Sequence, residues 1–318
     1  MRAIWLRGFG GPEVLVPGPA PDPVPGPGQV LIDVAHANIT FVETQFRAGR
    51  TGPFGGSPPL IPGNGVGGTI TDVGAGVDPA LVGRRVVSST GGSGGYAERV
   101  TVDATAPIEV PDPLALDAAV ALLADGRTAT MLIDAVDLRP GERVLVEAAA
   151  GGVGSLLVQL AAAAGARVVA LAGGPRKVSL LPGLGAAVAV DYREPDWTDR
   201  VRAATDGVDV VFDGVGGELG RAAFKLLDPG GRMVSFGLAS GEWAGVPPED
   251  ATARKVALLR PDVPPARLRA YTEQALAEAA AGRLRPLIGQ RFPLERAADA
   301  HAAIESRATV GKTLLDLH

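Results

Sequence analysis

The sequence predicts an α/β protein in which a β-rich domain is followed by a doubly wound parallel-sheet domain. Three observations carry this prediction. The chain has 318 residues, a length that fits two domains. In the first third, short segments with strand periodicity stand between Gly- and Pro-rich turns, as in a small barrel or sandwich. From about Ala118, strands alternate with helices, which is typical of βαβ units around a parallel sheet.

The N-terminal third is expected to form short strands joined by turns. Residues 3–6 show only a weak strand alternation. The proline-rich stretch Pro17–Gly28 is predicted to cross the surface between two strands, although its composition also fits a flexible linker or a PxxP ligand. In Gln29–Val34, alternate residues are apolar, as in a strand with one buried face. The same pattern returns in three later segments, Gly67–Val73, Arg85–Ser88 and Tyr96–Val102.

The rest of the chain is expected to alternate between helices and strands. A helix over Ala118–Val136 comes first, and a turn at Leu138–Gly141 follows it. The predicted strands are then Arg143–Val146, Arg167–Leu171, Val188–Val190, Val208–Phe212 and Arg232–Phe236, and the predicted helices between them are Gly154–Ala164, Trp197–Ala204 and Leu219–Leu227. The last part holds a long helix Ala266–Ala281 with Gly282 as its cap, the segment Leu284–Phe292, a helix Leu294–Ser306 and a final strand Lys312–Leu317.

Composition excludes several classes of protein. Hydrophobic residues make up 46% of the chain and charged residues 20%, so the chain can bury a large core and is not disordered. There is no cysteine, which excludes disulfides, a cysteine nucleophile, iron–sulfur clusters and thiolate-ligated zinc. The three histidines, His36, His301 and His318, stand apart from one another, without the spacing of a metal site. A net charge of −5 argues against a general nucleic-acid binder.

The sequence pattern favours neither a signal peptide nor a membrane span. The N-terminus lacks the apolar stretch of a signal peptide. One uncharged stretch, Ala148–Ala166, has the length of a membrane span, but it consists largely of Ala and Gly and is only weakly apolar. We therefore expect a cytoplasmic protein.

The most informative segment is a glycine-rich turn between a strand and a helix. Gly151, Gly152 and Gly154 follow the predicted strand at once, in the spacing Ala148-x-x-Gly151-x-x-Gly154, a variant of G-x-G-x-x-G. In dinucleotide-binding folds such glycines allow a tight turn and let the backbone approach the pyrophosphate at a helix N-terminus. The predicted pyrophosphate contacts are Ala150, Gly151, Gly152, Val153 and Gly154. The alternative is an ordinary βα turn of another α/β fold.

Charge after the next strand indicates which dinucleotide would bind. NAD-binding units usually carry an acidic residue about 20 residues on, which holds the ribose 2′-hydroxyl. Here no carboxylate stands between Glu147 and Asp191, and the loop instead contains Gly173, Arg176 and Lys177. The two cations would attract a 2′-phosphate, so NADPH is predicted over NADH. Alternatively, both are solvated residues at a helix start.

Motifs spread over nearly the whole chain resemble those of the zinc-independent, zeta-crystallin-like quinone oxidoreductases of the medium-chain dehydrogenase/reductase superfamily. They are Phe9–Leu15, Pro25–Leu31, Gly94–Glu98, Arg139–Glu142, Ala148–Gly154, Asp191–Arg193 and Ile304–Lys312. The resemblance implies a GroES-like catalytic domain, residues 1–118 and 265–318, and a Rossmann NADPH-binding domain, residues 119–264. It also implies a homodimer formed through the Rossmann domain.

The resemblance also assigns cofactor contacts to individual residues. Lys177 and Tyr192 match family positions near the adenosine 2′-phosphate, and Thr128 and Gly237 match positions near the nicotinamide. Ser240 lies in the same loop as Gly237, and Lys312 matches a family lysine near the cleft. The alternative for Tyr192 is a surface aromatic, and for Lys312 a surface cation at a strand end.

Departures from the family bear on the substrate. Asn64 and Gly65 stand where the zinc-dependent branch has a His-Glu pair, so we predict no metal and a substrate that delocalises negative charge itself, a quinone or an α,β-unsaturated carbonyl. The usual Asn-x-x-Asp-Thr-Tyr segment reads Thr40–Gln45 here. Thr40 and Gln45 are candidates for hydrogen bonds to the substrate, or else packing residues. Asp125 is a candidate proton donor, or else a helix-surface carboxylate.

Three functions remain open on the sequence alone. The first is an NADPH-dependent quinone reductase that transfers hydride from the cofactor. The second is an enone or enoyl reductase of natural-product metabolism, which would use the same residues. The third is a non-catalytic NADPH-binding sensor or structural protein, which the altered Thr40–Gln45 segment favours. A non-redox biosynthetic enzyme is a weaker alternative. The expected partner in the catalytic cases is a small quinone or enone.

Overall fold

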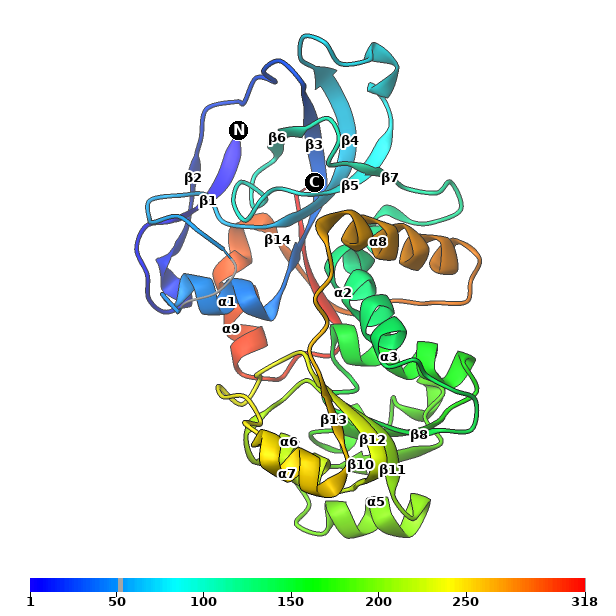
Figure 1. The fold of residues 1–318 in the computed structure, drawn as a ribbon. Helices are drawn as coiled ribbons and strands as arrows, with labels where there is room; N and C mark the ends of the chain where they lie inside the picture. The colour runs from blue at the N-terminus through cyan, green and yellow to red at the C-terminus, as the bar shows by residue number, and fades with distance from the viewer. Residues whose placement is uncertain (51–53, 318) are drawn as a thin grey trace. The chain divides into compact units, whose positions relative to one another are not determined.

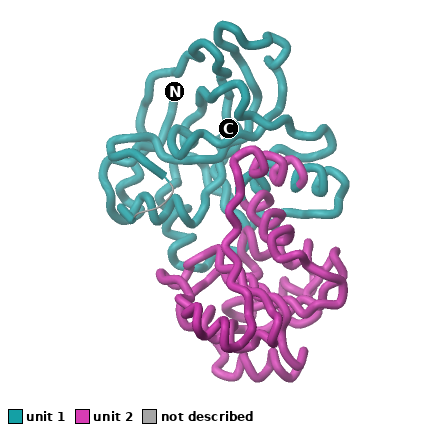
Figure 2. Tube along the Cα trace, viewed as in Figure 1, with its two compact units in different colours: residues 1–124, 275–318 teal, residues 125–274 magenta. Residues whose placement is uncertain are grey.

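The chain divides into two compact units (Figure 2). The computed structural model describes residues 1–50 and 54–317. Unit 1 consists of Met1–Ala124 and Ala275–His318, and unit 2 is Asp125–Gln274. Both boundaries fall inside long helices, α2 (Leu116–Ala135) and α8 (Pro265–Ala280), about six and about ten residues after the boundaries expected from the sequence. The expected boundaries lie close to the starts of these two helices, whereas the compact units divide within them.

Unit 1 is built on a β-sheet whose central strand is β3, Gln29–Ile39 (Figure 1). The strand order is β14-β15-β3-β4-β5-β7, and β6 also pairs with β3. The other strands of the sheet are β4 (Gly65–Val73), β5 (Arg85–Ser89), β6 (Arg99–Asp103), β7 (Ile108–Glu109), β14 (Ile288–Pro293) and β15 (Lys312–Asp316). Strands β1 (Arg2–Leu6) and β2 (Leu15–Pro19) form a separate antiparallel pair. Segments from both ends of the chain thus share one sheet.

The alternation predicted for the N-terminal strands is confirmed. Val30, Ile32 and Val34 of β3 are fully buried and belong to the main core of unit 1. The proline-rich stretch leads from β2 to β3, and only its first three residues belong to β2. Helix α9 (Ala297–Glu305) adds Ala297 to the same core. The short helices of unit 1 are α1 (Phe41–Arg47), η1 (Pro12–Val14), η2 (Pro79–Leu81) and η4 (Leu294–Arg296).

Unit 2 contains a parallel sheet with the strand order β10-β9-β8-β11-β12-β13. Its strands are β8 (Arg143–Val146), β9 (Arg167–Ala172), β10 (Val188–Asp191), β11 (Val208–Asp213), β12 (Leu227–Ser235) and β13 (Ala257–Leu259). Its helices, besides α2 and α8, are α3 (Gly152–Ala163), α4 (Pro175–Val178), α5 (Trp197–Thr205), α6 (Gly217–Phe224), α7 (Pro248–Arg254) and the turn η3 (Pro182–Leu184). This order is that of a doubly wound α/β fold, as predicted.

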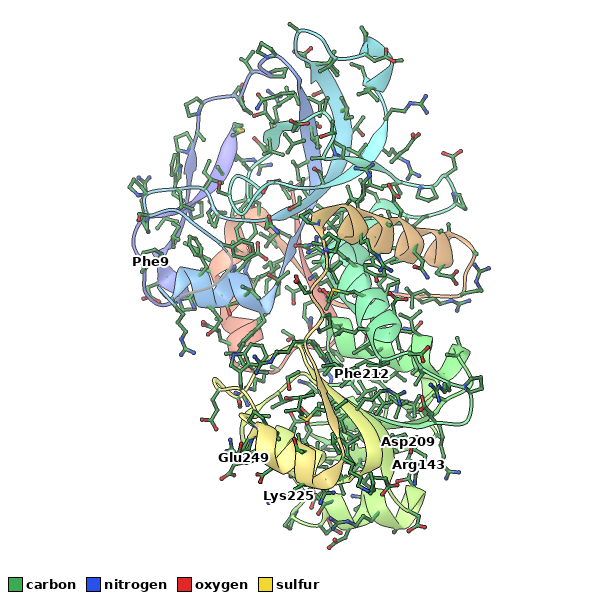
Figure 3. The ribbon with its side chains drawn as sticks, in the orientation of Figure 1. Phe9, Arg143, Asp209, Phe212, Lys225 and Glu249 are labelled. Atoms are coloured by element: carbon green, nitrogen blue, oxygen red, sulfur yellow. The ribbon has the colours of Figure 1, made fainter. Side chains whose placement is uncertain are left out.

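The direction in which the chain adds strands to the parallel sheet of unit 2 reverses between β8 and β11. From β8 the chain adds β9 and β10 on one side, and then returns to place β11 on the other side of β8. Phe212 of β11 is fully buried in this sheet (Figure 3). In open α/β sheets, ligands bind outside the carboxyl ends of the strands at such a switch point. The fold therefore predicts a ligand site at the segments that follow β8 and β11.

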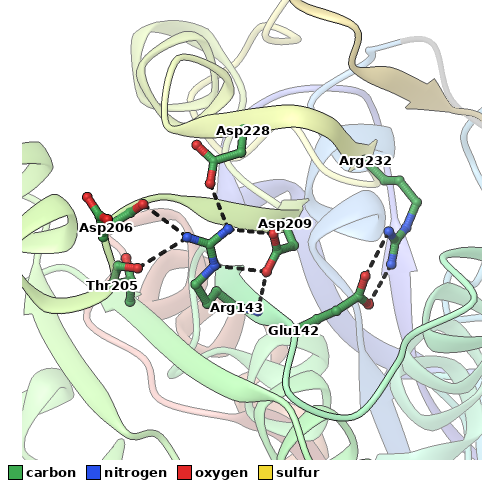
Figure 4. A network of polar contacts seen from close by, with 7 residues as sticks. All are labelled: Glu142, Arg143, Thr205, Asp206, Asp209, Asp228 and Arg232. Carbon is green, nitrogen blue, oxygen red and sulfur yellow. Dashed lines mark hydrogen bonds and ion pairs between the residues drawn. The ribbon is translucent and has the colours of Figure 1, made fainter.

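The opposite ends of the same strands are joined by charged side chains (Figure 4). Arg143 at the start of β8 donates to Asp209 of β11 and Asp228 of β12 at 2.6 Å each. The neighbouring Glu142 accepts from Arg232 of β12 at 2.7 Å. Together these contacts tie β8, β11 and β12 at their amino ends, which leaves their carboxyl ends for the glycine-rich turn and its neighbours.

No helix within the described ranges, 1–50 and 54–317, is long and apolar enough to cross a membrane.

Candidate functional site

The glycine-rich turn links β8 to α3 in the way the sequence predicts. Gly151 is the N-cap of α3 in extended conformation and has no side chain to cap the helix. The first N–H groups of an α-helix have no partner inside the helix, so those at the start of α3 are available to an anion. Ala148 adopts a left-handed φ of 47°, which turns the chain sharply after the strand. Ala150 is buried beneath this turn, whereas Val153 is half-buried.

Close packing explains why the turn needs glycine. A Cβ on Gly154 would lie 2.3 Å from the carbonyl oxygen of Ala148, and one on Gly151 would lie 3.1 Å from the same oxygen. A Cβ on Gly152 would lie 1.9 Å from Oδ2 of Asp125. Gly151 and Gly154 thus let the carbonyl of Ala148 approach, and Gly152 lets Asp125 approach, so the helix packs closely on the turn.

Asp125 lies against the first residue of α3. The side chain comes from α2 and is only 8% exposed, so the alternative of a surface carboxylate is wrong. A negative charge at a helix N-terminus is stabilised by the helix dipole. Burial lowers the pKa of the nearby Arg127, and the charge of Asp125 opposes that shift. Thr128, one turn further along α2, is half-buried. A role of Asp125 in proton delivery stays a prediction.

The loop after β9 carries the predicted 2′-phosphate contacts. Tyr192, just after β10, covers Gly173, because a Cβ on that glycine would lie 2.7 Å from the tyrosine oxygen. Arg176 is exposed and Lys177 is half-buried, both in the short helix α4. The structure therefore brings the loop and Tyr192 together, as the resemblance implied.

A third cation, Arg193, joins this loop and was missed from the sequence. Its guanidinium lies over Gly174, since a Cβ there would be 2.3 Å from a guanidinium nitrogen. Asp191 accepts from the backbone N–H of Gly174 at 3.0 Å and pairs with Arg193 at 3.2 Å. These hydrogen bonds outweigh burial and hold the pKa of Asp191 below its usual range. The signal was available in the motif Asp191–Arg193, two residues apart after a strand.

The loop after β12 is fixed by the backbone of the turn after β11. The N–H of Gly237 donates to the carbonyl of Asp213 at 3.3 Å, and the N–H of Ser240 donates to that of Val215 at 2.8 Å. The hydroxyl of Ser240 donates to the carbonyl of Glu242 at 2.9 Å. Gly237 and Ser240 thus lie in one loop outside the carboxyl end of β12, at the same edge of the sheet as the glycine-rich turn.

Two further carboxylates, Glu147 directly after β8 and Asp213 at the end of β11, are completely buried. Burial, and next the charge of Asp213, raise the pKa of Glu147 well above its ordinary value. The sequence offered a signal for this pair, because each carboxylate directly follows or ends an apolar strand. It was missed because nothing in one sequence shows that the two strands are neighbours.

Unit 1 carries the remaining predicted residues around the start of α1. Both the N–H and the hydroxyl of Thr40 donate to Oε2 of Glu43, at 2.6 and 2.8 Å. Glu43 is buried, and its other oxygen accepts from the N–H of Asn64 at 2.9 Å. Burial raises the pKa of Glu43, while the bonds from Thr40 and the charge of Lys312 oppose the rise. Lys312 is itself buried, at the start of β15, so it is not a surface cation.

Gln45 lies one turn further along α1. Its side-chain amide donates to the hydroxyl of Thr44 at 3.2 Å, and the residue is half-buried. Helix α1 itself was not predicted, although Thr40 and Glu43 have the spacing of a capping box. In unit 1 the structure thus groups Thr40 and Lys312 around Glu43, with Gln45 on the same helix, and the residues predicted to bind phosphate lie in unit 2.

No group of three potential metal ligands occurs within the described ranges of the chain.

Comparison with known proteins identifies the family. Residues 26–112 match the model of the alcohol dehydrogenase GroES-like domain, and residues 184–315 match a model described as zinc-binding dehydrogenase. A quinone oxidoreductase of Pseudomonas aeruginosa is 32% identical over 99% of both chains. The chain belongs to the zinc-independent quinone oxidoreductase family of medium-chain dehydrogenases and reductases. This confirms the resemblance found in the sequence, and with it an oxidoreductase enzyme.

Solved structures of this family superpose over the full length. The Escherichia coli quinone oxidoreductase complexed with NADPH has a TM-score of 0.91 and 29% identity, with 100% of both chains covered. A mycobacterial protein complexed with NADPH has a TM-score of 0.90 and 35% identity, again with 100% of both chains covered.

Proposed function

We propose that the protein is an NADPH-dependent oxidoreductase that transfers a hydride to a quinone. The NADPH assignment is supported by the Gly151–Gly154 turn together with the cations near the end of β9. Arg176 and Lys177 lie in the loop after β9, and Arg193, which follows β10 and pairs with Asp191, lies over Gly174 of that loop. NADPH in two family structures supports the same cofactor.

The residues present fit such a dinucleotide. The N-terminus of α3 would hold the pyrophosphate, since Gly151, Gly152 and Gly154 have no side chains of their own to cover the backbone. Lys177 and Tyr192 would hold the 2′-phosphate end, and the Gly237 loop would hold the nicotinamide end. When bound, the cofactor supplies a hydride donor. The protein positions the reactants and excludes water.

The hydroxyl of Thr40 has a defined role in this proposal. Its only proton is donated to Glu43. Its remaining capacity is therefore that of an acceptor, suited to an N–H or O–H group rather than to a carbonyl oxygen. A quinone oxygen would need another donor, for which Gln45 and Lys312 are the candidates in unit 1. The acceptor proposed is one that delocalises incoming charge itself, a quinone in the first place.

Oxidation of NADPH across a panel of quinones and enones tests the substrate class. Turnover of simple quinones, with little reaction of 2-alkenals, supports a quinone reductase. Faster reduction of enones to stereodefined saturated ketones would instead make the protein an enone or enoyl reductase. Tight NADPH binding without turnover of either class would contradict an enzymatic role and favour a sensor or structural protein.

A homodimer formed through unit 2 is part of the proposal. Strand β13 lies at the edge of the parallel sheet, paired with β12 on one side. Trp243 is half exposed beside a cavity lined by Leu258 and Leu259 of that strand. Light scattering on the purified protein measures the oligomeric state, and a monomer at micromolar concentration would contradict this part. A cytoplasmic location stays a prediction.

A further inference from the structure

Two buried carboxylates lie side by side at the switch point of the sheet in unit 2, where the strand order changes from β8 to β11. Glu147 follows β8 and Asp213 ends β11, and these strands are neighbours on either side of the switch point. Both side chains are 0% exposed and lie within hydrogen-bonding reach of each other. Two negative charges so close in a water-free interior repel strongly, so one of the two carboxyl groups must hold a proton.

Their hydrogen bonds differ in a way that shows which one holds it. Asp213 accepts from three donors: the N–H of Gly216 at 2.6 Å, the hydroxyl of Ser235 at 2.7 Å and the N–H of Val215 at 3.2 Å. Glu147 accepts from the N–H of Val215 through Oε2 at 3.1 Å, whereas its Oε1 is buried without a partner. A buried carboxylate oxygen that accepts no hydrogen bond is costly, but one that carries a proton can donate it.

The segment held by this pair supports the predicted nicotinamide loop. The carbonyl of Asp213 accepts from the N–H groups of Phe236 and Gly237, at 2.9 and 3.3 Å. The carbonyl of Val215 accepts from the N–H of Ser240, and a Cβ on Gly237 would lie 2.5 Å from the carbonyl of Gly214. On its other side, Glu147 directly precedes the glycine-rich turn. One side chain therefore connects the pyrophosphate turn with the loop at the nicotinamide end.

We propose that Glu147 and Asp213 share one proton, carried by Glu147, and that this neutral hydrogen bond positions the turn after β11, and through it the 236–240 loop, for the cofactor. Glu147 is then a positioning residue. The inference rests on the proposed function for its ligand, NADPH, but not for the protonation of the pair.

The groups that face Glu147 set the expected pH dependence. The charged group that faces Glu147 is Asp213 from β11. The N–H groups of Gly214 and Val215, in the turn after β11, donate to Glu147. The hydroxyl of Ser235 from β12 donates to Asp213. Because the pKa of Glu147 is raised in the folded protein, its contribution to stability is full below the unfolded pKa and is lost as the pH rises through the folded pKa.

Glu147→Gln and Glu147→Ala separate the alternatives. The amide of Gln donates to Asp213 and accepts from Val215 without titrating, whereas Ala does neither. Unfolding by urea, without cofactor, is measured for each protein between about pH 6 and about pH 9. NADPH affinity is measured over the same range by cofactor fluorescence. Glu142→Gln is the matched control, because Glu142 precedes the same strand and pairs with Arg232, which holds its pKa below the usual range.

The expected result is that wild type loses stability relative to Glu147→Gln as the pH rises. For Glu142→Gln the difference from wild type stays constant over this range, because the pKa of Glu142 is held below its ordinary value and the group is ionised in both the folded and the unfolded chain. NADPH binds Glu147→Gln as tightly as wild type, and binds Glu147→Ala about tenfold more weakly, the equivalent of one buried hydrogen bond.

Two outcomes overturn the inference. In the first, Glu147→Gln weakens NADPH binding as much as Glu147→Ala does, which would mean that the negative charge is needed. In the second, the stability difference between wild type and Glu147→Gln does not change with pH. Failure of wild type itself to bind NADPH would contradict the proposed function instead, and the urea series would still decide whether Glu147 holds the proton.

Discussion

Lys177 stands half-buried in α4, beside the strand end where Tyr192 covers Gly173. If its ammonium group contacts the 2′-phosphate, Lys177→Ala removes one charge-assisted contact that NADH never makes. We expect the KM for NADPH to rise about tenfold and that for NADH to stay unchanged. Steady-state kinetics with both cofactors measure this. Arg200→Ala, an exposed cation on α5, is the control and should alter neither value. Equal use of NADH and NADPH by wild type would rule out the preference.

Gly154 tests the packing of the glycine-rich turn, since an added Cβ would lie 2.3 Å from the carbonyl oxygen of Ala148. Gly154→Ala should cost about 2 kcal/mol of stability, the usual range for forcing an atom into a packed site, and should weaken NADPH binding. Thermal unfolding and cofactor fluorescence measure the two effects. Gly183→Ala is a matched control, because nothing lies within 4 Å of the added atom there. Equal behaviour of the two variants would contradict the packing argument.

Single residues were predictable where a local pattern specifies chemistry. The glycines after β8 follow from spacing alone, and the structure places them as expected. Glu147, Asp213 and the contact of Asp125 with Gly152 depend on which strands and helices are neighbours, and one sequence does not contain that information. The cofactor and substrate contacts assigned by resemblance, among them Thr40, Lys177 and Lys312, stay predictions.

At the scale of elements, β8 is held at its amino end by Arg143, which joins β11 and β12 (Figure 4). Arg143→Met keeps the aliphatic stem but leaves Asp209 and Asp228 facing each other without a cation. We expect a loss of about 2 kcal/mol at neutral pH. Arg143 lowers the pKa of Asp209, so this stabilisation is present above the unfolded pKa and is lost as the pH falls through the folded pKa.

Urea unfolding at neutral pH and near pH 4 therefore gives a smaller difference between the two proteins in acid. Arg139→Met is the control: Arg139 pairs with Asp137, and both side chains are more than 70% exposed, at 73% and 85%. Its expected effect is close to zero. A difference for Arg143→Met that persists unchanged in acid would show that packing, not charge, explains the loss.

Some elements were predicted nearly to the residue, and others were missed or extended too far. Strand β8 has the predicted bounds, and α8 differs by one residue at each end. Helix α1 and strand β13 are too short for a period to show. The predicted helix Leu219–Leu227 runs too far, because α6 ends at Phe224 and Leu227 already begins β12. Tertiary pairing with β11 decides that boundary.

For the whole molecule, NADPH should stabilise the folded state because only the folded chain presents the turn and the cationic loop together. At a concentration about 100 times its Kd, the gain is about 2.7 kcal/mol. We expect a clear rise in Tm with NADPH and a smaller one with NADH at equal concentration. Gly154→Ala should show a reduced shift. Absence of any shift in wild type would contradict the proposed cofactor.

The order in which the sheet of unit 1 is completed has a consequence for biosynthesis. Unit 2 is one continuous segment, whereas unit 1 combines the two ends of the chain. Strand β15 pairs with residues 36–39 of β3, so that edge of β3 has no partner until residues 312–316 have been synthesised and have paired with it. An unpaired strand edge invites association with other chains. The nascent protein is therefore exposed to aggregation through this edge until β15 is in place, and deletion of β15 should make the protein disproportionately insoluble.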